Sequence, residues 1–169
     1  MNKRVKKALI VAGIAGVAVL SVCIVGMVIL SPFSPPTISI KKMEKIFQED
    51  YDLLVSVAEY FQNSGCSSIV IHKSDERGYM TVLHPSPDQL VKKVPIEDPE
   101  VFRIIDSLFE EKGYWTITRD GNTICFNRWS SLAASRGIAY TIDGAAPEMQ
   151  YLTYYAKLSK EHWYYYKTD

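Results

Sequence analysis

A run of 23 residues without a charged side chain, from Ala8 to Leu30, constrains this chain more than any other feature of its sequence. As a helix rising about 1.5 Å per residue, the run would measure roughly 34 Å, which is enough to cross the hydrocarbon core of a bilayer. It is too long for the apolar core of a cleaved signal peptide, which usually has about 7 to 15 residues. The run therefore predicts an uncleaved signal-anchor, a single transmembrane helix over residues 8–30.

Lipoprotein processing at Cys23 is the alternative for this segment, because Leu20, Ser21 and Val22 before it loosely resemble a lipobox. Val22 is branched where a small residue is expected. The chain also stays apolar from Ile24 to Leu30, where a lipidated mature protein would turn polar. Both features favour the anchor over the lipid.

The basic residues predict the orientation of the anchor. Four of them, Lys3, Arg4, Lys6 and Lys7, precede residue 8, and cationic segments stay on the cytoplasmic side of a membrane. We therefore expect residues 1–7 to form a cytoplasmic tail and the C-terminal part to be extracytoplasmic. The formal net charge of the whole chain is 0, so no excess of basic residues indicates nucleic-acid binding.

Three prolines in residues 31–37 favour an extended backbone without amide donors, which predicts a short stiff spacer. The remaining residues, 38–169, are long enough for one domain of ordinary size.

Hydrophobic spacing predicts two helices in this domain. Ser39 is a candidate N-cap for a helix that runs to about Asn63. Asp98 followed by Pro99 predicts the start of a second helix, and Gly113 marks its end.

Short β-branched and aromatic segments bounded by turn residues predict strands in the rest of the domain. The Asp120-Gly121 dipeptide between two of them is typical of a tight hairpin. The expected strands cover residues 68–73, 79–83, 114–119, 122–129, 137–142, 149–158 and 162–167, with a brief strand or extended linker at 90–96. Because short turns join neighbouring strands, we expect an α+β domain with a mainly antiparallel, meandering sheet and two helices packed on one face.

The cysteines of the domain are Cys66 and Cys125. In an oxidising compartment they are candidates for a disulfide that would close a loop of about 60 residues. Two separate buried thiols are the alternative, since the sequence gives no distance between them.

The sequence predicts no catalytic, cofactor or metal residues. The three histidines, His72, His84 and His162, lack the spacing that presents two imidazoles to one metal ion. The glycines form no phosphate-binding loop, and no serine or cysteine lies in a nucleophile motif.

Aromatic residues gather near the C-terminus, where Trp163, Tyr164, Tyr165 and Tyr166 follow one another. In a strand, Trp163 and Tyr165 point to one face and Tyr164 and Tyr166 to the other. Either one set enters the core and the other covers cross-strand neighbours, or the outer set forms a binding platform for a glycan, a peptide or a protein. The candidate platform consists of Tyr164, Tyr166, Trp129, Arg128 and Arg136.

These patterns favour a single-pass membrane protein that contacts the lipid bilayer through residues 8–30 and acts by binding a protein or glycan. The domain has no N-x-[ST] sequon, since Asn63, Asn122 and Asn127 all fail the pattern, which favours a bacterial cell envelope as its setting. An accessory subunit of a membrane complex and an envelope hydrolase are the alternative functions.

Overall fold

The computed structural model describes residues 38–83, 91–130 and 134–168. The predicted anchor at 8–30 and the predicted spacer at 31–37 lie outside these residues, as does His84. Within the described ranges, no helix combines the length and the hydropathy that a membrane crossing requires.

Both predicted helices are confirmed, and their first residues are held as the sequence suggests. Helix α2 spans Ile40–Asn63, and the Ser39 hydroxyl accepts a hydrogen bond from the Lys42 amide at 3.3 Å. Helix α3 spans Pro99–Glu110, with Asp98 as its N-cap, and the Asp98 carboxylate accepts hydrogen bonds from the amides of the first turn. These side chains bind amide groups that have no partner within the helix.

The remaining elements are eight strands, which agrees with the prediction of an α+β domain. All neighbouring strands in the sheet are antiparallel. The bounds are β1 Ser68–His72, β2 Tyr79–Leu83, β3 Val91–Pro95, β4 Thr116–Asp120, β5 Thr123–Ser130, β6 Ser135–Thr141, β7 Leu152–Lys157 and β8 Trp163–Thr168.

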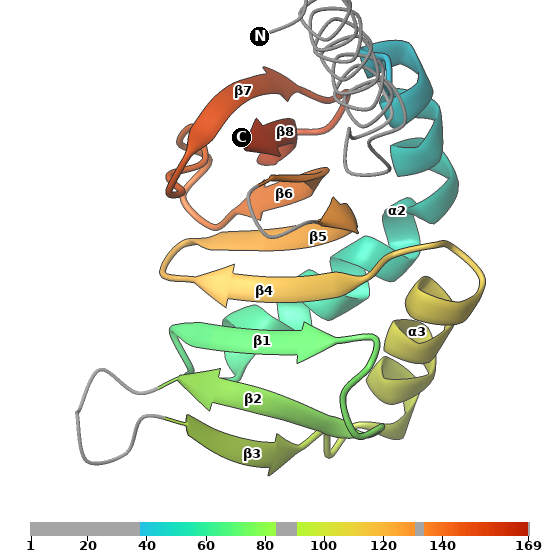
Figure 1. Cartoon of the computed structure of the whole chain (residues 1–169), viewed down its shortest axis with the longest axis vertical. Coiled ribbons are helices and arrows are strands. Elements are labelled where there is room, and N and C mark those ends of the chain that lie inside the picture. The colour runs from blue at the N-terminus through green and yellow to red at the C-terminus, as the bar shows by residue number, and fades with distance from the viewer. Residues whose placement is uncertain (1–37, 84–90, 131–133, 169) are drawn as a thin grey trace, which may run out of the picture. The chain divides into compact units, whose positions relative to one another are not determined.

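The order of the strands across the sheet is β3-β2-β1-β4-β5-β6-β8-β7, which departs from a simple meander in two places. Strand β1 pairs with β4 as well as with β2, so the chain runs outward through β2 and β3 and then through α3 before it returns to the sheet beside β1. Strand β8 lies between β6 and β7 (Figure 1). As a result β3 and β7 are the two edge strands.

Helices α2 and α3 both lie on one face of the sheet, as predicted (Figure 1). Alternate residues of the strands point to this face and form the main core with the helices. In β8, Trp163 and Tyr165 belong to this core, and the rings of Phe47 and Trp163 are 5.3 Å apart. Burial of these large rings supplies much of the apolar area that holds α2 against the sheet.

A smaller apolar cluster lies on the opposite face of the sheet. It consists of Cys125, Ala139, Tyr164 and Tyr166, against which Met149 and Leu152 pack. Neighbouring Gly137 has no room for a side chain, because a Cβ there would lie 2.0 Å from the carbonyl oxygen of Phe126.

Candidate interaction surface

The structure does not bring the five residues of the predicted platform together on one surface. Tyr164 and Tyr166 lie on the face away from the helices, where their side chains are only 2% and 1% exposed. The hydroxyl of Tyr164 donates to the carbonyl of Gly144 at 2.9 Å, and that of Tyr166 donates to the side chain of Asn127. Both rings therefore pack within the domain, which was the alternative that the sequence left open.

The other members of the predicted platform lie elsewhere. Arg128 reaches Asp50 of α2 and so lies on the helix-covered face of the sheet. Trp129 pairs with Arg136 after an irregularity in the register of β5 and β6, and Arg136 is buried. Opposite faces of one sheet separate these residues from Tyr164 and Tyr166.

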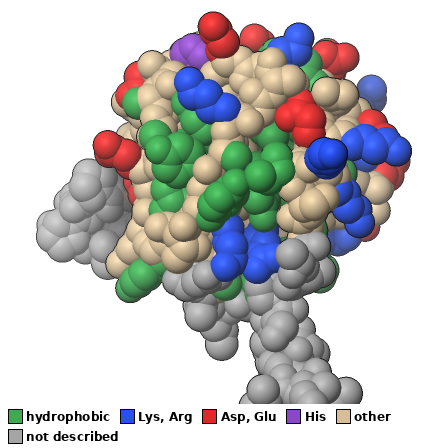
Figure 2. Space-filling view, turned by 90° about the horizontal axis from the view of Figure 1, so that it is seen from above, with side chains coloured by type: hydrophobic (Ala, Val, Ile, Leu, Met, Phe, Trp, Pro, Cys, Tyr) green, Lys and Arg blue, Asp and Glu red, His purple; other side chains and the backbone are tan. Residues whose placement is uncertain are grey.

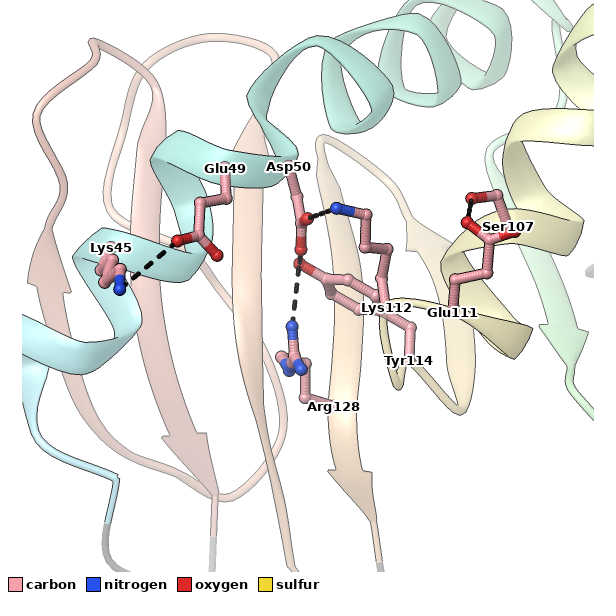
Figure 3. A network of polar contacts seen from close by, with 8 residues as sticks. All are labelled: Lys45, Glu49, Asp50, Ser107, Glu111, Lys112, Tyr114 and Arg128. Atoms are coloured by element: carbon pink, nitrogen blue, oxygen red, sulfur yellow. Dashed lines mark hydrogen bonds and ion pairs between the residues drawn. The ribbon is translucent and has the colours of Figure 1, made fainter.

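Arg128 belongs instead to a charged cluster around Asp50, whose side chain is buried in the middle of α2 (Figure 3). The Asp50 carboxylate lies 3.0 Å from Lys112 Nζ and 3.4 Å from Arg128 Nη1. The hydroxyl of Tyr114 donates to the same carboxylate at 3.1 Å, and the Arg128 guanidinium lies 4.9 Å from the centre of the Tyr114 ring.

This Asp50 cluster is suited to holding structure rather than to proton transfer. Burial, followed by the charge of Asp50, raises the pKa of the Tyr114 phenol far above its usual range, so the phenol stays protonated as a donor. The carboxylate has two cationic partners and one hydroxyl donor. These interactions compensate for the free energy that it costs to remove the carboxylate from water. The cluster therefore ties α2 to the segment after α3 and to β5.

Both cysteines of the domain are free thiols in the structure. Cys125 belongs to the cluster on the open face of the sheet, whereas Cys66 packs against the main core from the connection between α2 and β1. Burial raises the pKa of the Cys125 thiol to about 12. At neutral pH this thiol is protonated and is therefore a poor nucleophile.

The exposed aromatic residues near the C-terminus lie on β7 rather than on β8. Tyr154 and Tyr155 are 42% and 48% exposed, and Tyr151, just before the strand, is 68% exposed. Tyr155 makes an edge contact with the ring of Tyr164 at 6.1 Å, whereas Tyr154 lies 6.0 Å from Tyr165 on the other face. Figure 2, which views the molecule from the β7 end of the sheet, shows hydrophobic side chains gathered there.

We call this surface the tyrosine edge: the strand β7 with the side chains of Tyr154 and Tyr155. Only one side of β7 pairs within the sheet, with β8. No strand of the described residues pairs with its other side, which is the position at which a further strand adds to a sheet. The tyrosines stand on opposite faces of β7, so they flank this backbone from both faces.

The opposite edge of the sheet, β3, has different chemistry. Its exposed residues are Val91, Lys92, Lys93 and Pro95. Lysine and proline at an edge discourage pairing with another chain, because the charge resists burial and proline lacks an amide donor. Strand β3 has two exposed lysines and a proline, whereas β7 has one exposed lysine, Lys157, and no proline.

The sequence shows the tyrosines of β7, but it does not indicate that they lie at an edge of the sheet. Residues 149–158 were expected to form a strand, and the structure has β7 within that range. Chain order suggests that β7 would follow β6 in the sheet. Strand β8 lies between β6 and β7, so β8 is an inner strand and β7 is at the edge. No local sequence pattern indicates that β7 and β8 take these positions.

Among the described residues, no group of three or more His, Cys, Asp or Glu side chains is placed to hold a metal ion. Comparison of the chain with known protein families, with curated proteins and with solved structures finds no match.

Proposed function

We propose that this protein is a single-pass, membrane-anchored interaction module of a bacterial cell envelope. Residues 8–30 span the bilayer, the N-terminus is cytoplasmic, and the α+β domain stands outside. The length of the apolar run and the four cations before it support this arrangement.

The domain binds an extended segment of a partner protein, which adds as a further strand to β7. The observation that carries this proposal is the contrast between the two edges of the sheet: lysines and a proline on β3, exposed tyrosines on β7. A strand is the occupant that satisfies a row of backbone donors and acceptors. Tyrosine adds a large contact area at a small cost in side-chain entropy.

The dimensions of the tyrosine edge limit the partner segment. Strand β7 has 6 residues, so it pairs with about 20 Å of extended chain at roughly 3.4 Å per residue. Alternate side chains of that segment would contact Tyr154 on one face and Tyr155 on the other. Apolar side chains at these positions would complete the contact.

Site-specific photocrosslinking in intact cells tests this mode of binding. A benzoylphenylalanine replaces Thr153 or Lys157 in the full-length chain, and mass spectrometry maps the residues to which it couples. We expect both probes to reach one partner segment, at positions about four residues apart, because paired strands advance together. The same probe at Lys93 of β3 is the matched control and should give no such adduct.

Two variants complete this test. Tyr154→Ser with Tyr155→Ser should reduce the adduct yield from both probes on β7, whereas Tyr79→Ser on the exposed surface of β2 should leave it unchanged. Adducts only to a second copy of this chain would replace the proposal with self-association. Adducts to a glycan, or equal yields from β3 and β7, would also refute it.

A further inference from the structure

A hollow of about 400 Å³ lies away from the tyrosine edge, at the end of β6 on the open face of the sheet. It is enclosed by the turn between β4 and β5, by the last residue of β6 and by the connection from β6 to β7. We call it the acidic hollow. The lining residues on which the argument depends are Asp120, Asn122, Thr123, Thr141, Asp143 and Glu148.

Three carboxylates give the acidic hollow its charge, and among the described residues only one of them has hydrogen-bond partners. Asp143 accepts hydrogen bonds from the Ala145 amide at 3.0 Å and from Asn122 Nδ2 at 3.1 Å. These hydrogen bonds lower the pKa of the Asp143 carboxyl, with that of Ala145 contributing most. The side chains of Asp120 and Glu148 are exposed and make no hydrogen bond or ion pair with another described residue.

Thr141 supplies an independent observation in the same hollow. Its side chain is only 1% exposed, and its Oγ1 has no hydrogen-bond partner among the described residues. Thr141 stands opposite Thr123 in the β5–β6 ladder, so both threonines lie on the floor of the hollow. A buried hydroxyl without a hydrogen bond costs free energy, unless a ligand or another group forms a hydrogen bond with it.

We infer that the acidic hollow binds a linear alkylamine that carries two or more ammonium groups. Each ammonium has three N–H donors and no acceptor, which matches carboxylates and a free hydroxyl oxygen. One ammonium would lie against Thr141 and Asp143, and the others would lie toward Asp120 and Glu148. The inference goes beyond the proposed function, because it concerns a site that the tyrosine edge does not include.

A chain of spaced charges fits this hollow better than one metal ion does. A bound cation such as Ca²⁺ needs several oxygen ligands that converge within about 2.6 Å of one point. The described acidic side chains form no such group. Ammonium groups separated by methylenes reach carboxylates that stand apart, and the methylenes can pack on Ala145 and Ala146.

The first arm of the test concerns the hydroxyl of Thr141, measured on full-length protein in detergent micelles. Thr141→Val removes the hydroxyl at almost constant volume. Without ligand, this variant should be as resistant to thermal unfolding as the parent, or more resistant. Thr168→Val is the matched control and should unfold at a lower temperature, because Thr168 Oγ1 accepts from the Ser135 amide at 2.8 Å.

The second arm measures binding by calorimetry with two probes of the same chemistry. Spermidine represents a free polyamine, and an acetylated Lys-Gly-Lys amide represents the lysines of a partner protein. We expect Thr141→Val to weaken binding of the tighter probe by about tenfold or more, as loss of one hydrogen bond to a charged group does. Asp120→Asn with Glu148→Gln should weaken it by about tenfold.

Controls separate a site from general attraction to negative charge. Glu59→Gln with Glu97→Gln removes two exposed carboxylates outside the hollow and should leave both affinities unchanged. The inference is overturned if neither probe binds. It is also overturned if Mg²⁺ displaces the probe equally effectively from the Thr141→Val variant and from the parent. Loss of stability in Thr141→Val equal to that in Thr168→Val would also overturn it, since the hydroxyl would then have a structural partner.

Discussion

The four consecutive aromatic residues of β8 show how little a side chain's chemistry says about its exposure. Trp163 and Tyr165 pack in the main core, and Tyr164 and Tyr166 pack in the cluster on the opposite face. Alternation along the strand, which the sequence predicts, assigns each residue to its face. Whether a face is open depends on what packs against it, here Met149 and Leu152 from the β6–β7 connection and the start of β7.

Thiol reactivity tests the environment of Cys125. At pH 8, iodoacetamide should alkylate Cys66 at least tenfold faster than Cys125 in the folded full-length chain, with sites mapped by mass spectrometry. Cys66 is partly exposed, whereas burial holds the pKa of Cys125 near 12, so almost no thiolate is present there. Comparable rates in the native protein, or a recovered Cys66–Cys125 disulfide peptide, would contradict the structure.

The raised pKa of Cys125 also predicts that the stability of the domain depends on pH. The pKa of Cys125 is higher in the folded state than the ordinary thiol value of 9.0. Its contribution to stability is therefore complete below about pH 9 and is lost as the pH rises toward 12. Cys125→Ser should flatten this alkaline loss of stability, and Cys66→Ser is the control.

At the scale of elements, the Asp50 cluster explains how a long helix keeps its rotation and height on the sheet. The buried apolar side chains of α2 determine which face of the helix packs against the sheet. They do not prevent the helix from sliding along the strands. A carboxylate with partners on two other segments fixes one point of contact. The sequence offered Asp50 as one of several acidic residues on this helix, and nothing local distinguished it from Asp52.

Substitution of Asp50 tests this role. Asp50→Asn removes the charge that compensates Lys112 and Arg128, and should lower the free energy of unfolding by about 3 kcal/mol. Asp52→Asn, on the exposed face of the same helix, should change it by less than about 0.5 kcal/mol. Denaturant titration of the full-length chain, followed by tryptophan fluorescence, measures both. Equal effects of the two substitutions would show that the cluster adds nothing to stability.

For the whole molecule, the proposed orientation in a membrane would determine which partners can reach the domain. Four cations before the apolar run predict a cytoplasmic N-terminus. An extracytoplasmic domain would meet envelope proteins, and its free thiols would then lie in an oxidising compartment. The different clusters that hold Cys66 and Cys125 keep these thiols from pairing.

Labelling of intact cells checks the orientation. A cysteine added after Asp169, in a chain with Cys23, Cys66 and Cys125 replaced by serine, should react with a membrane-impermeant maleimide before lysis. A cysteine placed after Asn2 is the control and should react only after lysis. The reverse pattern would put the domain in the cytoplasm and would refute the proposed setting of the tyrosine edge.

Local sequence patterns predict the two helices, the approximate position of each described strand and the two faces of each strand. These features depend on local causes: capping side chains, turn residues and the spacing of apolar positions. The tertiary structure places β8 inside the sheet and β7 at its edge, brings Asp50 to Arg128, and sets Thr141 in the lining of the same hollow as Asp120 and Asp143. These outcomes depend on pairing between segments far apart in the chain, where the free energy depends on the whole set of partners and not on any one segment.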